Sequence, residues 1–334
     1  MSVFYEIIPL DTLFFRGSTP MEAGQNVAVS MFPPPVSVVE GSFRTAFLLQ
    51  KGISPEDYAS GKDTSANEII GNPSEKAAFE VSSILIKKNG QFYAKVPASW
   101  YLDSEKKPKE KTDYIGKTIV EAKRNQKFLD DMFVMSSSES LPFAQAKENA
   151  QPLGNIWVSI DFINSARKVL EENDFLLQNE ILAFEQRTGI ALDSSKHTVE
   201  GQLYSASHIR LLDGVSMIVG ISKEIGLKDS GKIQLGGERK LCSYRKIDFC
   251  MPEKSENMGN QFLSPAPVEA TKEILESLIA SSKLVITSGW DLAKGFHKPT
   301  TSWIPAGAVF TKNINGICIL NEIGRAVQQE CRDR

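Results

Sequence analysis

The sequence feature that most constrains the fold is a hairpin signal in the first third of the chain. Residues 81–87 and 91–97 are rich in strand-forming residues and flank Asn89-Gly90, a pair typical of a two-residue β-turn. A strand over residues 3–9 and a helix over residues 38–49 come before it. The order β, α, β, β is typical of a ferredoxin-like or RRM-like domain, which needs one more helix and one more strand.

The rest of the chain mixes strands and helices without regular βαβ alternation. Ser37 is the expected N-cap of the first helix, with Glu40 as its capping-box partner. At 334 residues the chain has room for two domains. We predict an α+β fold of two ferredoxin-like (RRM-like) domains with insertions, over residues 1–150 and 151–334. The later strands are expected at 156–163, 203–211, 215–221, 283–288 and 308–312, and the later helices at 165–186 and 269–281.

The overall charge limits where a nucleic acid can bind. The formal net charge is −3, whereas free-standing nucleic-acid-binding proteins are usually basic. Any RNA site must therefore be a local patch, and acidic surface elsewhere is available to a basic partner. The N-terminal segment lacks the pattern of a signal peptide, and no apolar run is long enough to cross a membrane. We expect a cytoplasmic protein without membrane association.

Metal, cofactor and nucleotide-hydrolysis motifs are missing from the sequence. The four cysteines form no CxxC pair, the three histidines are scattered, and no DxD, GGDD or HD string occurs. Neither a Walker P-loop nor a GxGxxG motif is present. We therefore expect no metal, no cofactor and no metal-dependent phosphodiester chemistry.

The most informative segment is GKIQLGGERKLCSYRK, residues 231–246. Two glycines let a backbone approach a phosphate closely, and the neighbouring cations attract it. Tyr244 is a candidate for stacking on a base. The alternative is an ordinary tight turn with a solvated basic face. The local charge of the segment 231–246 is +4, because it contains one acid, Glu238, and five cations, which are Lys232, Arg239, Lys240, Arg245 and Lys246.

Two loops carry further candidates. Arg16 follows Phe14 and Phe15 at a loop tip, where arginine beside aromatic rings suits single-stranded RNA. We expect the two phenylalanines themselves to belong to the core. The segment 288–310 contains Lys294, His297 and Lys298. It is a candidate for a second contact with the RNA backbone or for a subunit interface, and the alternative is an ordinary connecting loop.

The segment 189–211 supports an enzymatic alternative. His197, Tyr204, His208 and Arg210 could act as acid, base and phosphate clamp in a metal-free ribonuclease. The opposing interpretation, which we favour, is one exposed loop histidine and one structural histidine.

The order of these strings resembles a known family over most of the chain. The strings are PLDTLFFRGSTP, FPPP before a helix, GIALD…TVEGQLY…IRL, LGGERKL and GW…KPT…WIPAGAVF. Together they are similar to the third-subunit family of the type III-B Cmr complex, a RAMP-superfamily family. The resemblance implies two ferredoxin-like domains and no catalysis. It also implies binding to the 5′ tag of the guide RNA (crRNA), docking on the large polymerase-like CRISPR subunit, and contact with backbone RAMP subunits.

The resemblance also selects residues. The family's glycine-rich loop corresponds to residues 236–240 and its N-terminal loop to Arg16 and Gly17, where the family often has an acid instead of Gly17. A metal-independent endoribonuclease that processes guide RNA, and a structural subunit that touches only protein, remain the alternative functions. The predicted RNA-binding residues are Arg16, Gly17, Arg44, Gly236, Gly237, Glu238, Arg239, Lys240 and Arg245, with Lys294 and Lys298 as further candidates.

Overall fold

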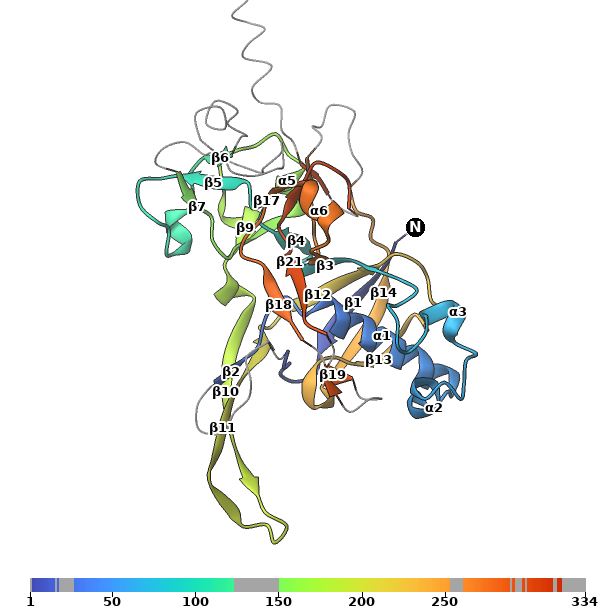
Figure 1. Cartoon of the computed structure of the whole chain (residues 1–334). Coiled ribbons are helices and arrows are strands. Elements are labelled where there is room, and N and C mark those ends of the chain that lie inside the picture. The colour runs from blue at the N-terminus through green and yellow to red at the C-terminus, as the bar shows by residue number, and fades with distance from the viewer. Residues whose placement is uncertain are drawn as a thin grey trace, which may run out of the picture. The chain divides into compact units, whose positions relative to one another are not determined.

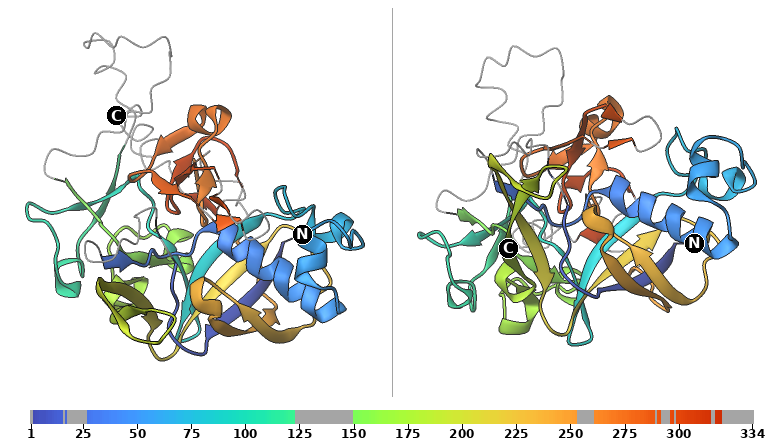
Figure 2. Two further views of the ribbon diagram at one scale, coloured as in Figure 1. Left: turned by 60° about the horizontal axis from the view of Figure 1, so that its bottom comes forward. Right: turned by 90° about the horizontal axis from the view of Figure 1, so that it is seen from below.

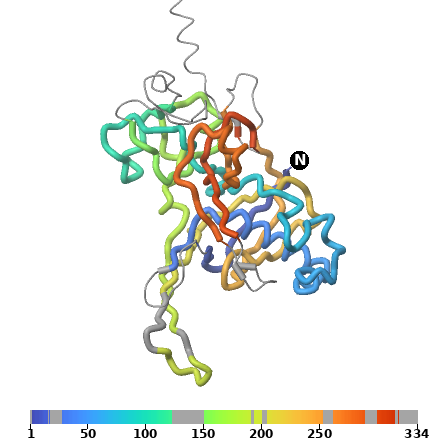
Figure 3. Tube along the Cα trace, viewed as in Figure 1, coloured from blue at the N-terminus to red at the C-terminus, as the bar shows by residue number. Residues whose placement is uncertain are grey.

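The structure is a computed structural model in which the chain divides into two compact units. Each unit is assembled from three separate stretches of chain. Figure 3 traces the chain, coloured by residue number from blue at the N-terminus to red at the C-terminus. Unit 1 contains Met1–Ile84, Asn179–Phe249 and Ile286–Ser302, and unit 2 contains Leu85–Gln178, Cys250–Val285 and Trp303–Arg334. The residues described are 2–15, 17, 27–122, 150–252, 261–288, 290–291, 296–297, 299–314 and 317–319.

The core of unit 1 is a sheet built around strand β1 (Val3–Pro9). The sheet order is β13-β14-β1-β12-β3, and β1 pairs antiparallel with both of its neighbours. The middle of β1 is buried on both faces, as expected for a central strand. The other strands are β3 (Val81–Lys88, of which residues 81–84 belong to this unit), β12 (Val215–Ile221), β13 (Ser230–Gln234) and β14 (Leu241–Ile247).

Helix α1 (Val36–Lys51) lies across one face of this sheet (Figure 2). Phe43 packs on Tyr5 of β1 with the ring centroids 5.2 Å apart, and on Phe79 at 6.4 Å. Burying these aromatic rings contributes to holding the helix against the sheet. The helix ends at Gly52, whose left-handed φ of 71° places its N–H on the last carbonyls. The short helices α2 (Pro55–Ala59) and α3 (Asn67–Ile70) follow.

A long antiparallel hairpin extends away from the sheet of unit 1 (Figure 1). It consists of β10 (Leu182–Leu192) and β11 (Thr198–Leu211), and β11 also pairs in parallel with β2 (Val27–Val29). The remaining elements of this unit are the 3₁₀ turn η4 (Gly237–Arg239), β19 (Trp290–Asp291) and β20 (Phe296–His297).

Unit 2 consists mainly of short strands. The Asn89-Gly90 turn joins β3 to β4 (Gln91–Lys95), and Trp157, Phe162 and Phe175 form part of its core. The boundary between the two units falls inside four elements, which are β3, η3 (Gln178–Glu180), β18 (Val285–Thr287) and β21 (Thr301–Ile304). The other elements are β5 (Trp100–Asp103), η1 (Lys111–Asp113), β6 (Ile119–Glu121), β7 (Ala150–Pro152), β8 (Trp157–Ser159), α5 (Ile160–Ile163), η2 (Glu172–Asp174), β9 (Phe175–Leu176), β15 (Gln261–Leu263), β16 (Val268–Glu269), α6 (Lys272–Glu276), β17 (Leu278–Ala280), β22 (Val309–Phe310) and β23 (Ile317–Ile319).

The sequence predictions for the first third are confirmed, with one exception. The Asn89-Gly90 turn has positive φ at both residues (50° and 81°), as a type I′ hairpin requires. The expected capping box of Ser37 and Glu40 is wrong. Pro35 holds the N-cap position and the helix begins at Val36, so Ser37 lies inside it.

Three predictions in the rest of the chain are wrong in type or length. The helix expected over 165–186 is absent, and β9 and the start of β10 lie there instead. The strand expected over 156–163 stops at Ser159, whose hydroxyl caps α5. The helix expected over 269–281 covers only Lys272–Glu276, because the chain then enters β17 and pairs with β22.

The α+β class is confirmed, with many short strands, mostly antiparallel, and few helices. The predicted domain boundary at residue 150 adjoins a stretch outside the described residues and stays a prediction. Within the described part of the chain, no helix combines the length and apolar character that a membrane span requires.

Candidate nucleic-acid interface

The glycine-rich loop is fixed against the segment that follows β1. The N–H of Gly237 donates to the Phe14 carbonyl oxygen at 2.8 Å, and Leu235 N–H donates to the Lys240 carbonyl at 2.8 Å. Gly236 has φ 83°, and a Cβ there would lie 2.5 Å from the same Phe14 oxygen. Glycine is therefore required at 236 for backbone conformation and for close approach to Phe14.

The aromatic residues of the N-terminal loop are buried, as predicted. Phe14 and Phe15 belong to the core, and Leu13 forms an antiparallel bridge with Ile209 of β11. The space beside Gly236 and Gly237 is thus filled by phenylalanine instead of being open to a phosphate. Gly17 is half-buried and belongs to no helix or strand, whereas Arg16, Lys294 and Lys298 lie outside the described residues.

Most of the cations in the predicted basic segment have acidic partners. Lys240 pairs with Asp11 and Glu238, Arg245 with Glu6, and Lys246 with Glu224. Arg239 and Lys232 are exposed and make no ion pair or hydrogen bond with the described residues. The +4 charge read from the sequence is therefore largely neutralised, and two cations remain available to an anion.

Tyr244 is not available for stacking on a base. Its ring is buried, it lies edge-on to Tyr5 with centroids 5.9 Å apart, and its hydroxyl is hydrogen-bonded to Gln50 of α1. The expectation from the sequence is wrong here because β14 turns this side chain toward α1, away from solvent.

Arg44 lies on α1, and its guanidinium binds the loop around α3. Its nitrogens donate to the carbonyl oxygens of Ile70 at 2.8 Å and Asn72 at 2.7 Å, and to those of Glu75 and Lys76 at 3.3 Å. These contacts take up much of its fork of donors. They give Arg44 a role in holding residues 70–76, and its predicted contact with RNA stays untested.

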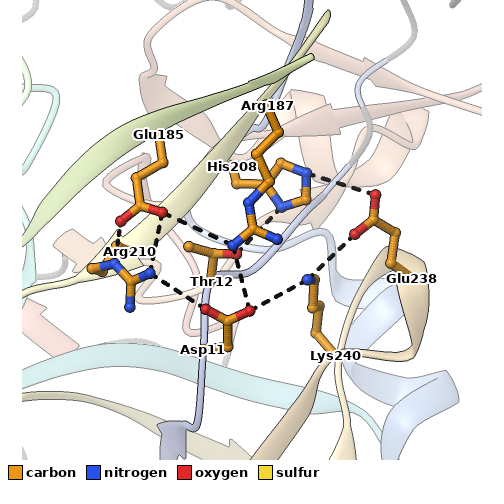
Figure 4. Close-up of polar contacts among 8 residues, drawn as sticks. All are labelled: Asp11, Thr12, Glu185, Arg187, His208, Arg210, Glu238 and Lys240. Atoms are coloured by element: carbon orange, nitrogen blue, oxygen red, sulfur yellow. Dashed lines mark hydrogen bonds and ion pairs between the residues drawn. The ribbon is translucent and has the colours of Figure 1, made fainter. Parts of the chain in front are cut away.

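Beside the glycine-rich loop lies a group of charged residues that the sequence analysis did not assemble. We call it the ionic cluster (Figure 4). The register of β10 on β11 brings part of this cluster together. Glu185 lies opposite His208 and Ala183 lies opposite Arg210. Alternate residues of the two strands therefore share one face at the base of the hairpin. The cluster consists of Asp11, Glu185, Arg187, Arg210, Glu238 and Lys240, with three carboxylates and three cations.

Asp11 is at the centre of the ionic cluster. Its carboxylate lies 3.4 Å from Arg187 Nη2, 3.3 Å from Arg210 Nη2 and 3.5 Å from Lys240 Nζ. The backbone N–H of Thr12, ahead of the Arg187 guanidinium, lowers the pKa of Asp11 to about 2. Asp11 is therefore ionised at every pH at which the protein is expected to work.

His208 lies under the ionic cluster and is only 1% exposed. Its ring stacks on Phe14 at 5.0 Å, its Nδ1 lies 3.4 Å from Thr12 Oγ1, and its Nε2 lies 3.7 Å from Glu238 Oε1. Burial lowers the pKa of His208 despite Glu238, which raises it. The imidazole is thus a neutral, packed part of the core.

The two histidines do not form a catalytic pair. His197 lies in the exposed turn before β11, and His208 is eleven positions further along an extended strand. At about 3.3 Å per residue, they are roughly 35 Å apart. A general acid and base must both reach one scissile bond, so this geometry opposes the ribonuclease alternative. The described residues contain no group of three or more His, Cys, Asp or Glu that could hold a metal.

Comparison with known proteins shows the family to which the chain belongs. A family model described as CRISPR-associated protein (Cas_Cmr3) matches residues 5–316. The chain belongs to this family. Membership in Cas_Cmr3 confirms the resemblance inferred from the LDTLFFR and LGGER strings. None of the curated proteins compared with the chain matches it.

Two solved structures contain chains with the same fold as this Cas_Cmr3 protein. One is the cryo-EM structure of the Type III-B Cmr-beta bound to cognate target RNA and AMPPnP, with 15% identity and a TM-score of 0.52, covering 92% of this chain and 85% of that one. The other is the Type III-B Cmr-beta bound to cognate target RNA, with 16% identity and a TM-score of 0.51, covering 92% and 86%.

Proposed function

We propose that this Cas_Cmr3 protein is a non-catalytic, RNA-binding subunit of a type III-B CRISPR effector in antiviral defence. It anchors the 5′ tag of the crRNA and docks on the large polymerase-like subunit beside the backbone RAMP subunits. Family membership and the fold shared with Cmr-beta chains support the assembly. We further propose that the chain works in the cytoplasm without a cofactor, and that it contains two divergent ferredoxin-like domains, over residues 1–150 and 151–334.

The observation that carries the RNA-binding role is the presentation of Arg239. The loop from Gly236 to Lys240 is fixed by the Gly237–Phe14 hydrogen bond, and it leaves Arg239 exposed without an acidic partner among the described residues. Arg239 also has a positive φ of 50°, which is unusual for an arginine. Backbone strain of this kind occurs preferentially at functional sites. A guanidinium held this way can bind a phosphate of the RNA backbone.

The paired cations predict that the isolated chain binds RNA weakly. Few free cations remain in the segment from residue 231 to 246, and the net charge of −3 repels phosphate over the rest of the surface. A neighbouring subunit that adds a second contact raises the affinity by effective concentration.

The test is a titration of labelled 5′-tag RNA against the chain alone and against the chain with the large subunit. We expect weak, salt-sensitive binding by the chain alone and much tighter binding by the pair. Equal affinity in both titrations contradicts the proposed dependence on the partner. No binding by either one contradicts the RNA-binding role itself.

A further inference from the structure

Three cations from different parts of unit 1 converge on one carboxylate. Arg187 comes from β10, Arg210 from β11 and Lys240 from the end of the glycine-rich loop, and all three approach Asp11 (Figure 4). The Asp11 side chain is 49% exposed, and those of Arg210 and Arg187 are 45% and 39% exposed. Solvent therefore reaches the carboxylate and two of the cations around it.

The contacts to Asp11 are long for ion pairs of this type. They measure 3.3–3.5 Å, whereas charge-assisted N–H···O bonds are typically about 2.7–2.9 Å. Three cations around one carboxylate form an anion site that Asp11 fills loosely. A phosphodiester also carries one negative charge, spread over two non-bridging oxygens, and arginine guanidinium matches that geometry well.

The cations have other partners that hold them when Asp11 is not there. Glu185 binds Arg210 through both of its oxygens and lies 3.9 Å from Arg187. Glu238 lies 3.3 Å from Lys240 Nζ. The site is therefore preorganised, because its cations stay in position if the central anion is exchanged.

The exchange is electrostatically balanced only if Asp11 moves out. With Asp11 in place the six charges of the ionic cluster cancel, and a phosphate brought next to an ionised carboxylate is repelled. Asp11 follows the end of β1 in an exposed connection between Leu10 and Leu13, whose N–H groups donate to the carbonyls of Leu241 and Ile209, so its side chain can turn into water while these backbone bonds remain. In the turn Asp11 gives up the Thr12 N–H and three cations, which water replaces at the exposed carboxylate, while the phosphate takes over the same three cations.

We propose that Asp11 occupies a phosphate-binding site formed by Arg187, Arg210 and Lys240, and that a backbone phosphate of single-stranded RNA displaces it. Asp11 is then a built-in competitor that lowers the affinity of the free chain for RNA. This rests on the proposed RNA-binding function and adds to it a second, self-occupied site beside Arg239.

The experiment compares variants of the full chain in binding a fluorescein-labelled octauridylate at low salt, by fluorescence anisotropy. Asp11→Asn keeps the size and an acceptor for the Thr12 N–H but removes the competing charge. We expect it to bind on the order of threefold to tenfold more tightly than the unmodified chain, since exposed ion pairs are each worth a few-fold in an equilibrium. Asp248→Asn is the matched control, because Asp248 is exposed directly after the end of β14 and its loss changes the net charge equally.

A double-mutant cycle locates the effect. Arg210→Ala should weaken binding, and in the Asp11→Asn, Arg210→Ala chain most of the gain from Asp11→Asn should disappear. Melting of each variant checks folding, and Asp11→Ser, whose hydroxyl can also accept the Thr12 N–H, serves as a second charge-removing variant.

The outcomes separate this inference from the proposed function. If the unmodified chain binds RNA and Asp11→Asn leaves the affinity equal or lower, Asp11 organises the cations instead of competing, and the inference is wrong while RNA binding stands. A gain just as large for Asp248→Asn also overturns it, since only net charge would be acting. If no variant binds the octauridylate, this inference is wrong, whereas the proposed function is decided separately by the titration of 5′-tag RNA with the large subunit present.

Discussion

The Phe14 carbonyl oxygen accepts the Gly237 N–H at 2.8 Å and lies 2.5 Å from where a Cβ on Gly236 would be. Gly236→Ala must therefore strain a backbone with φ 83° and break the packing of the loop on Phe14. We expect the free energy of unfolding to fall by about 1–3 kcal/mol. Chemical denaturation of the variant and the unmodified protein measures this difference in unfolding free energy. Gly41→Ala, at an exposed position of α1 where the added Cβ would meet nothing within 4 Å outside the helix's own backbone, should stabilise the protein by about 0.5–1 kcal/mol.

Arg44 should matter for stability more than for RNA. Arg44→Ala removes the donors to the carbonyls of residues 70–76, and we expect a loss of about 2–3 kcal/mol of unfolding free energy. Amide hydrogen exchange around α3 should speed up. Lys51→Ala removes the same charge from the exposed end of α1 together with its contact to the Phe47 ring, so it should cost no more than about 1 kcal/mol and leave hydrogen exchange around α3 unchanged. A variant of Arg44 that is fully stable but binds guide RNA poorly would reverse this assignment.

Arg239→Ala should weaken guide binding and lower the slope of log affinity against log salt by roughly one unit, as expected for one lost phosphate contact. The measurement is a salt series with the chain and the large subunit together. Lys62→Ala in the loop after α2 removes an equal charge elsewhere in unit 1 and should leave the slope unchanged. An unchanged slope for Arg239→Ala would mean that this side chain does not touch the backbone of the RNA.

The buried His208 predicts that stability depends on pH. Its pKa is lowered in the folded protein, so the unfolded chain takes up the proton first as the pH falls. Stability from this residue is complete above the unfolded pKa of about 6.5 and is lost progressively below it, down to the lower folded pKa. Urea denaturation between about pH 7.5 and 5.5 should show the loss. His208→Gln should remove this component of the loss, whereas His197→Gln at the exposed turn should retain it.

Neither histidine should affect catalysis. With His197 and His208 far apart and His208 neutral and packed on Phe14, a metal-free assay of the chain on repeat RNA should detect no cleavage. Effector complexes assembled with His197→Ala or His208→Gln should cleave target RNA as the unmodified complex does. Loss of cleavage in a fully assembled variant complex would restore the enzymatic alternative.

Sequence reasoning succeeded where the signal is local. The Asn89-Gly90 turn needs only its own backbone preferences, and strand β1 and helix α1 are long enough to show their type. It failed over 165–186 because apolar residues at irregular spacing there belong to short strands and turns. Leu182 and Phe184 alternate as in a strand, which was the available signal.

The ionic cluster could not be predicted from the sequence, for a different reason. Asp11 meets Arg187, Arg210 and Lys240 across 176, 199 and 229 residues of sequence. Only the register of β10 on β11 and the position of the glycine-rich loop bring these side chains together, and neither can be read locally. For the same reason the sequence overstated the free charge of the basic segment, since its neutralising acids Glu6, Asp11 and Glu224 are remote or outside the motif.

The position of β1 in its sheet has a consequence for synthesis on the ribosome. Its two neighbours, β12 and β14, begin at Val215 and Leu241, so β1 has no partner until roughly 200 further residues have been made. At translation rates of roughly 5–20 residues per second, this leaves a strand with Phe4, Tyr5 and Ile7 unpaired for about 10–50 s. Nascent chains of this protein are thus exposed to edge-to-edge association for that interval, and holding factors that bind apolar segments would act there first.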